Sequence, residues 1–225
     1  MSGWISRAAE IFAGAGWVGW PLLVMSVVAL ALCIERAAYF ALLRRRTRPE
    51  QVAAVVRGLA EDGLARTRSK PDGFVGDFVD ALFAASGNGP VGDAAVLAAG
   101  SVVRARLERW LPTLSTIITA APMLGILGTV TGIIQSFGLL GSAEVARDTT
   151  AMAAGISEAL YTTAFGLVIA LVVLFPYNAF RAAADSALAT LETVGAAAIE
   201  GSAAQVGRDG GADQPGPASA STKSA

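Results

Sequence analysis

Three side chains in the apolar stretches of this sequence could bind or pass on a proton or a small cation. Glu158 is the one acidic residue in the run 149–180, and a carboxylate there is costly in lipid unless it faces protein, water or a partner. Thr129 and Thr163 offer hydroxyl groups near the middle of two apolar stretches. Together they suggest a narrow polar path. The path is incomplete, because the apolar runs 18–34, 113–141 and 149–180 contain no acidic residue other than Glu158.

Small residues surround these polar groups at helical spacing. In one stretch they are Ala121, Gly125, Gly132 and Ser136, with Gly128 adjoining; in the other they are Gly155, Ala159, Gly166 and Ala170. Such stripes let two helices approach closely in lipid, so we expect the two stripes to be helix-packing faces that line a pore. Glu158 lies at the edge of its stripe, roughly 14 Å below the start of the apolar run.

A purely structural role is the alternative. A threonine in a membrane helix most often donates to its own backbone one turn back, and glycines spaced by four residues often serve packing alone. In a membrane scaffold without an ion pathway, Glu158 would only bond to a neighbouring helix. The carboxylate favours the pathway, since an ionisable group inside a span indicates function by default. A small secondary transporter is disfavoured, because the three stretches contain no internal repeat and no broken helix pair.

The elements that must position these residues are membrane helices. The chain is 54% hydrophobic and only 16% charged, and its mean hydropathy is +0.56. Three stretches are long enough to span a bilayer. We therefore expect an all-α integral membrane protein with transmembrane helices at 17–40, 112–141 and 151–180 and a helical cytoplasmic section between the first two.

Composition excludes several other classes of function. With 17 Lys and Arg against 18 Asp and Glu, the net charge of -1 gives no basic surface for nucleic acid. The chain has no His, and Cys33 is its one cysteine, so neither an internal disulfide nor a Cys/His metal cluster can form. No nucleotide-binding loop occurs. We expect no enzyme activity, no catalytic residue, no metal and no cofactor.

Arginines predict which end of each span is cytoplasmic. They follow the first span (Arg44, Arg45, Arg46, Arg48), precede the second (Arg104, Arg106, Arg109) and follow the third (Arg181). The N-terminus is therefore expected outside, 41–111 and the C-terminus inside, and 142–150 as a short periplasmic loop.

The remaining segments are expected to be helical or disordered. Helices are predicted at 49–64, 74–85 and 93–111 in the cytoplasmic section, and at 181–206 as a continuation of the third span. Residues 207–225 have the Gly, Pro and Ser content of a disordered tail. Residues 1–16 fit either a short amphipathic helix at the membrane surface or an extension of the first span.

Two quoted stretches resemble a known family. "AAPMLGILGTVTGIIQSF" (120–137) and "GISEALYTTAFGL" (155–167), followed by "YN" (177–178), are similar to the ExbB/TolQ/MotA family of proton-channel subunits, closest to its ExbB and TolQ branch. The proline, the glycines, the Gly-Thr-Val triplet, the glutamate and the second threonine fall in order. The family's pore threonines match Thr129 and Thr163, and its span-three glutamate matches Glu158.

The resemblance implies a proton-channel subunit of a motor complex in the bacterial inner membrane. It implies a homopentamer around the single spans of an ExbD/TolR-like partner, whose membrane aspartate supplies the missing acidic group. The proton-motive force would then energise an envelope process, either TonB-dependent or Tol-type transport, with a TonB/TolA-like protein as a further partner, or motility.

Two positions depart from the family pattern. Thr131 stands where that pattern usually has Trp, which adds a hydroxyl beside the stripe. Pro176 lies later than the family's proline, which usually falls near Val172 here. Because a proline removes a helix hydrogen bond, we expect any bend in the third span to lie closer to the cytoplasm.

Overall fold

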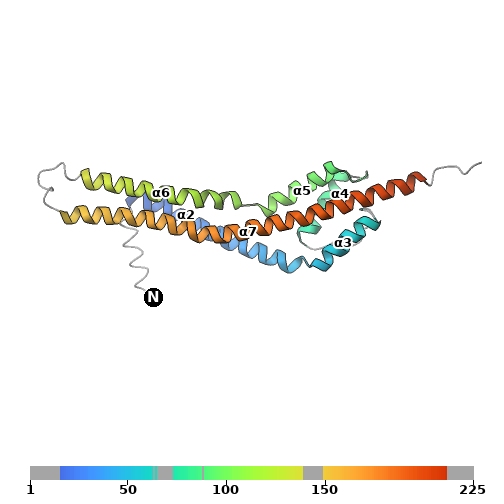
Figure 1. Ribbon diagram of the computed structural model, residues 1–225, viewed down its shortest axis with the longest axis horizontal. Coiled ribbons are helices and arrows are strands. Elements are labelled where there is room, and N and C mark those ends of the chain that lie inside the picture. Colours follow the sequence, from blue (N-terminus) through green and yellow to red (C-terminus); the bar gives the residue numbers. More distant parts are fainter. Residues whose placement is uncertain (1–15, 63, 65–72, 88, 139–148, 212–225) are drawn as a thin grey trace, which may run out of the picture. The chain divides into compact units, whose positions relative to one another are not determined.

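A computed structural model describes residues 16–62, 64, 73–87, 89–138 and 149–211 (Figure 1). Within these ranges every regular element is a helix, which confirms the all-α prediction. The helices are α2 (Gly16–Arg46), α3 (Pro49–Asp62), α4 (Phe74–Ser86), α5 (Asp93–Leu107), α6 (Leu111–Gly138) and α7 (Thr149–Gly211). The predictions for residues 1–15, 142–148 and 212–225 lie outside the described residues.

Three helices are long and apolar enough to cross a membrane. The candidate spans are Trp17–Arg44, Leu111–Gly138 and Met152–Arg208. The prediction of a helical membrane protein with three transmembrane helices is confirmed. Helix α7 begins at Thr149, within the segment expected to be a loop, and continues through 207–211, where we expected the tail. No proline occurs there before Pro215 to stop the helix.

Helices α5 and α6 are separate elements of the chain. We expected one helix over 93–111, but α5 ends at Leu107 and α6 starts at Leu111. Trp110 between them has φ 67, a left-handed conformation that is uncommon for a residue other than glycine. The Trp110 carbonyl then accepts a hydrogen bond of 3.0 Å from the Leu114 amide, which starts the new helix.

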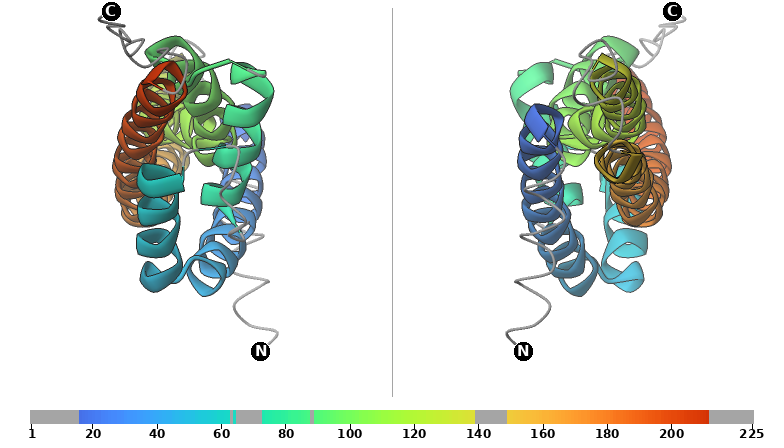
Figure 2. Two further views of the ribbon diagram at one scale, coloured as in Figure 1. Left: turned by 90° about the vertical axis from the view of Figure 1, so that its right-hand side faces the viewer. Right: turned by 90° about the vertical axis from the view of Figure 1, so that its left-hand side faces the viewer.

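The chain forms two compact units, and α2 and α7 each contribute to both. The first unit comprises residues 1–40 and 108–183, and the second comprises 41–107 and 184–225. In the first unit, α6 and the start of α7 run side by side (Figures 1 and 2). A small core joins α2 to them, with buried Val18, Leu22 and Ala121 packed by Met25, Leu124 and Ile169.

Helix α2 also carries a buried charge in the first unit, which the sequence analysis did not single out. The Arg36 side chain is only 2% exposed. Its Nη2 lies 3.0 Å from a carboxylate oxygen of Glu35, and its guanidinium lies 4.7 Å from the ring centroid of Tyr39. A buried guanidinium needs such partners. Nearby, Phe40 stacks on Phe180 with ring centroids 5.7 Å apart.

The second unit is built from amphipathic helices. Its buried residues recur every three or four positions, including Val55 and Leu59 in α3, Val75, Phe78, Val79 and Leu82 in α4, Ala99, Val103 and Leu107 in α5, and Leu191, Val194 and Ala198 in α7. The Val91 amide donates a buried hydrogen bond of 2.8 Å to Ser202 Oγ, which ties the start of α5 to α7.

Two phenylalanines of α4 provide a matched test of this packing. Phe78 is 1% exposed and Phe83 is 38% exposed. Phe78→Ala should lower the free energy of local opening by about 3–5 kcal/mol, since it creates a cavity in a packed core. Phe83→Ala should lower it by at most about 1 kcal/mol. Hydrogen exchange of the α4 amides, measured by mass spectrometry, checks both values, and equal effects would contradict the packing described here.

Candidate functional site

Helices α6 and α7 contact each other through the two small-residue stripes. The contacts pair Ala121 with Gly166, Gly125 with Thr163, Gly128 with Thr162, Gly132 with Ala159, and Ser136 with Gly155. Residue numbers rise along α6 as they fall along α7, so the helices are antiparallel. The stripes expected from spacing therefore face each other in the first unit.

The approach is close enough that glycine is required at its centre. A Cβ added to Gly125 would lie 2.9 Å from Thr163 Cα and 3.0 Å from the Thr162 carbonyl oxygen. Both of those atoms are backbone, so neither can rotate away. A Cβ on Gly132 would lie 2.6 Å from Ala159 Cβ. The absence of side chains brings the polar groups of α7 within reach of the α6 backbone.

Thr163 and Thr129 form a hydroxyl pair across this contact, referred to below as the threonine pair. Thr163 Oγ1 donates to the Gly125 carbonyl oxygen at 2.7 Å and lies 3.4 Å from Thr129 Oγ1. Thr129 Oγ1 lies 2.7 Å from the carbonyl oxygen of Ile126 on its own helix and donates to it. A hydroxyl has one hydrogen and two lone pairs. With both hydrogens engaged by carbonyls, the half-buried pair presents acceptor lone pairs to its surroundings.

Thr162 also belongs to this contact, and the sequence analysis did not single it out as a site residue. Its side chain is only 2% exposed and lies against Gly128. Its Oγ1 donates to the Ala159 carbonyl oxygen at 2.6 Å and lies 3.5 Å from the Gly125 carbonyl oxygen. The spacing in the sequence could have identified Thr162, because it is three residues after Ala159 and four before Gly166, and so shares their face of the helix.

Glu158 is not part of the threonine pair. It precedes Thr163 by five residues, which at 3.6 residues per turn places the two side chains about 140° apart around α7. The Glu158 side chain is exposed in this chain. From the sequence we expected Glu158, Thr129 and Thr163 to line one path. The structure brings Thr129 and Thr163 together and leaves Glu158 facing outward, where a second molecule can reach it.

The additional hydroxyl of Thr131 is satisfied within its own helix. Its Oγ1 lies 2.9 Å from the Leu127 carbonyl oxygen and 3.1 Å from that of Gly128. Ser136 behaves in the same way, with its Oγ 2.9 Å from the Gly132 carbonyl oxygen. Such local bonds are the usual state of hydroxyls in membrane helices. Thr163 differs from both, since its hydroxyl bonds to another helix.

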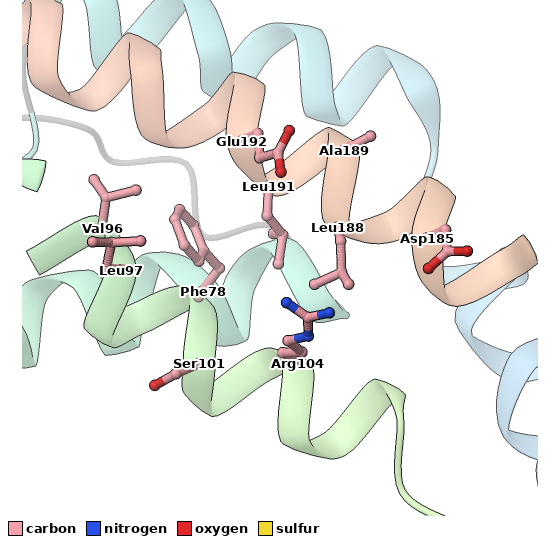
Figure 3. Close-up of a pocket in the computed structure, with 11 residues that line it drawn as sticks. Phe78, Val96, Leu97, Ser101, Arg104, Asp185, Leu188, Ala189, Leu191 and Glu192 are labelled. Carbon is pink, nitrogen blue, oxygen red and sulfur yellow. The ribbon is translucent and has the colours of Figure 1, made fainter. Parts of the chain in front are cut away.

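The second unit contains a groove of about 530 Å³ between α4, α5 and α7 (Figure 3). Phe78 lies at its centre, and Arg104 projects from α5 toward Leu188 of α7. Asp185 and Glu192 add two carboxylates along α7. Among the described residues, no three His, Cys, Asp or Glu side chains cluster as metal ligands would.

Comparisons with known proteins identify similar sequences. Residues 92–193 match the MotA/TolQ/ExbB proton channel family. The chain is 32% identical over 179 residues to the protein named ExbB-like 3 of Synechocystis sp., covering 74% of this chain and 81% of that protein. It is 28% identical over 189 residues to the ExbB homolog of Methanothermobacter thermautotrophicus (82% of this chain, 67% of that protein). It is 41% identical over 80 residues to the Tol-Pal system protein TolQ of Pseudomonas aeruginosa (36% and 34%).

Proposed function

We propose that this chain, which belongs to the MotA/TolQ/ExbB proton channel family, is the proton-channel subunit of an inner-membrane motor complex. The complex would use the proton-motive force to energise an envelope process, such as TonB-dependent or Tol-type transport or motility. The observation that carries this proposal is the threonine pair, which joins two apolar helices at the Gly125 carbonyl.

The chemistry of the threonine pair supports a positively charged cargo. Since both hydroxyl hydrogens are donated to backbone carbonyls, the free lone pairs can accept a hydrogen bond from a hydrated proton or from a protonated carboxyl group. An anion would meet only acceptors and would be repelled. In apolar surroundings this difference is larger than in water, because the effective dielectric constant is lower.

A proton carrier on a second chain completes the proposed path. Threonine hydroxyls do not ionise near neutral pH, and the two hydroxyls of the pair can only pass a proton on. An ExbD/TolR-like single-span partner with a membrane Asp would supply a group that binds and releases it, with five copies of this chain surrounding the partner. The energy released by proton flow would be passed to a TonB/TolA-like protein. The N-terminus would be periplasmic and the C-terminus cytoplasmic, as the arginines favour.

Glu158 would act near the outer end of this path. Its exposed carboxylate lies in an apolar helix, so it needs water or a donor from another chain to offset the cost of its charge. A negative charge there would raise the local concentration of protons at the entrance. Glu158 therefore complements the threonine pair from another face of α7.

Glu158→Gln tests the charge at this position. The amide keeps hydrogen-bonding capacity but loses the charge, so we expect proton flux to fall by at least about tenfold, which corresponds to the loss of roughly 1.4 kcal/mol of electrostatic stabilisation. Flux is measured with a pH-sensitive dye in vesicles that contain the purified complex. Glu192→Gln is the matched control, since Glu192 is an exposed glutamate in the second-unit part of α7.

A scaffold without an ion pathway predicts a different result. In that case Glu158 would serve only as a hydrogen-bonding group, and Glu158→Gln would behave like the unchanged protein. Wild-type flux in both Glu158→Gln and Glu158→Ala would overturn the role proposed for this charge.

A further inference from the structure

We infer that Glu158, Thr131 and Gln135 form a second polar site that binds a hydrated proton, on the flank of the α6–α7 contact opposite the threonine pair. The inference rests on the proposed function and deepens it, because it names the groups that act with Glu158 near the outer end of the path. All three side chains belong to apolar helices, where polar groups need polar partners. Glu158 and Gln135 are exposed in this chain, and Thr131 is half-buried.

The threonine pair shows where the two flanks of this contact lie. Gly128 lies against Thr162, and the residues that follow them, Thr129 and Thr163, meet on one flank. Each step along a helix turns about 100°, and in an antiparallel pair one step forward along either helix turns toward the same flank. One step back from a contact therefore turns toward the opposite flank on both helices.

The residues that precede the contacts carry the second set of polar groups. Gly132 lies against Ala159, and the residues before them are Thr131 and Glu158. Thr131 and Glu158 are therefore on the same flank and at the same level of the helix pair. Gln135 is four residues after Thr131, so it lies on this flank one turn farther along α6.

The direction of helical side chains brings Gln135 and Glu158 toward each other. Such side chains lean toward the N-terminus of their own helix, and α6 and α7 run in opposite directions. Gln135 therefore leans toward the level of Thr131, and Glu158 leans toward the level of Gln135. Ala154 is one turn from Glu158 on the same flank, so α7 places only a methyl group beside Gln135.

Helix α2 identifies this flank independently. Its buried residues pack with Leu124 and Ile169, which directly precede Gly125 and Ala170 of the small-residue stripes. The second site therefore lies on the side of the α6–α7 pair that α2 covers farther along. Glu158 comes before that covered part, roughly 16 Å along α7 from Ile169. Since the threonine pair occupies the other side, the two sites are distinct.

The oxygens of this site match a ligand with several hydrogens and a positive charge. The Thr131 hydrogen is engaged by the carbonyls of Leu127 and Gly128, at 2.9 and 3.1 Å from Oγ1, so its lone pairs can accept. An ionised Glu158 carboxylate only accepts, and the Gln135 amide oxygen accepts as well. Three acceptors suit the three hydrogens of a hydronium ion, and the carboxylate offsets its charge.

Two substitutions test this site in vesicles that contain the purified complex. Thr131→Val keeps the branched shape and removes the hydroxyl, and Gln135→Leu keeps a similar size and removes the amide. Each should lower proton flux about fivefold, the factor that one hydrogen bond is worth. Thr131→Ser keeps the hydroxyl, so its flux should stay within about twofold of the unchanged protein. Thr119→Val, which removes an exposed hydroxyl elsewhere on α6, serves as the control and should leave flux unchanged.

Combined changes test whether the three groups bind one ligand. If they do, adding Thr131→Val to Glu158→Gln should lower flux by less than about twofold further, since the site is already lost. Fold-losses that multiply would overturn a shared site.

The outcomes separate this inference from the proposed function. Wild-type flux in either Thr131→Val or Gln135→Leu, with flux lost in Glu158→Gln and Thr163→Val, would overturn the second site and leave the proposed channel intact. Equal losses in Thr131→Val and Thr131→Ser would also overturn it, because they would indicate packing. Wild-type flux in both Glu158→Gln and Glu158→Ala would overturn the role of the charge and this inference with it.

Discussion

Thr163→Val is expected to abolish proton flux through the complex while leaving the protein assembled in the membrane. Valine has nearly the volume of threonine, so the packing against Gly125 is retained. What is lost is the hydroxyl that reaches the Gly125 carbonyl at 2.7 Å and Thr129 at 3.4 Å. Removing one preorganised hydrogen-bonding group from a reactive site typically lowers rates at least about 100-fold.

A double substitution shows whether the threonine pair works as a unit. If it does, Thr129→Val alone should reduce flux strongly, and Thr129→Val combined with Thr163→Val should cost little more than either change alone. Additive losses would contradict a shared role. Thr119→Val is the matched control, because Thr119 is exposed on α6 and its hydroxyl lies 2.9 Å from the Thr116 carbonyl oxygen of its own helix. Its flux should be unchanged.

Gly132→Ala should weaken the contact between α6 and α7, and exchanging the methyl group should restore it. The new Cβ would lie 2.6 Å from Ala159 Cβ, so the helices must separate. Overpacking of this kind typically costs about 1–3 kcal/mol. Gly132→Ala with Ala159→Gly moves the methyl from one helix to the other and removes the clash. We expect the pair to recover stability to within about 1 kcal/mol, because the number of helical glycines stays the same.

Thermal unfolding of the detergent-solubilised complex measures these stabilities, and proton flux reports whether the threonine pair is still aligned. Gly138→Ala is the control, since a Cβ at Gly138 has nothing within 4 Å. Gly125→Ala is expected to resist compensation, because its Cβ would meet backbone atoms of Thr162 and Thr163. If the exchanged pair performs no better than Gly132→Ala alone, the register of the two helices differs from the one described.

The faces of α6 and α7 could be predicted from the sequence, because periodicity determines which residues share one side of a helix. Steps of three and four residues were enough to expect Gly125 and Thr163 at a helix contact. Periodicity does not determine how closely the second helix approaches. The hydrogen bond from Thr163 to the Gly125 carbonyl depends on that approach, since it joins two helices.

The break at Trp110, the burial of Arg36 and the direction of Glu158 could not be predicted from local sequence patterns. Tryptophan rarely adopts a positive φ, so no pattern predicted that Trp110 would separate α5 from α6. The sequence did not indicate that Arg36 would be buried, because its burial depends on how the residues around it pack. Glu158 was recognised from its charge, but its outward direction became clear only once the position of α6 against α7 was known.

The hydrogen-bond acceptor at the centre of the site is the backbone carbonyl oxygen of Gly125, which limits what mutagenesis can reveal. No substitution can delete that oxygen, because every amino acid supplies the same carbonyl group. A saturation screen would find Gly125 intolerant for a steric reason, and would report the chemistry of the contact only through Thr163. Genetic data alone would therefore assign the hydrogen bond to α7 and overlook half of it. Direct detection of the acceptor calls for isotope-edited infrared spectroscopy with a ¹³C label at the Gly125 carbonyl.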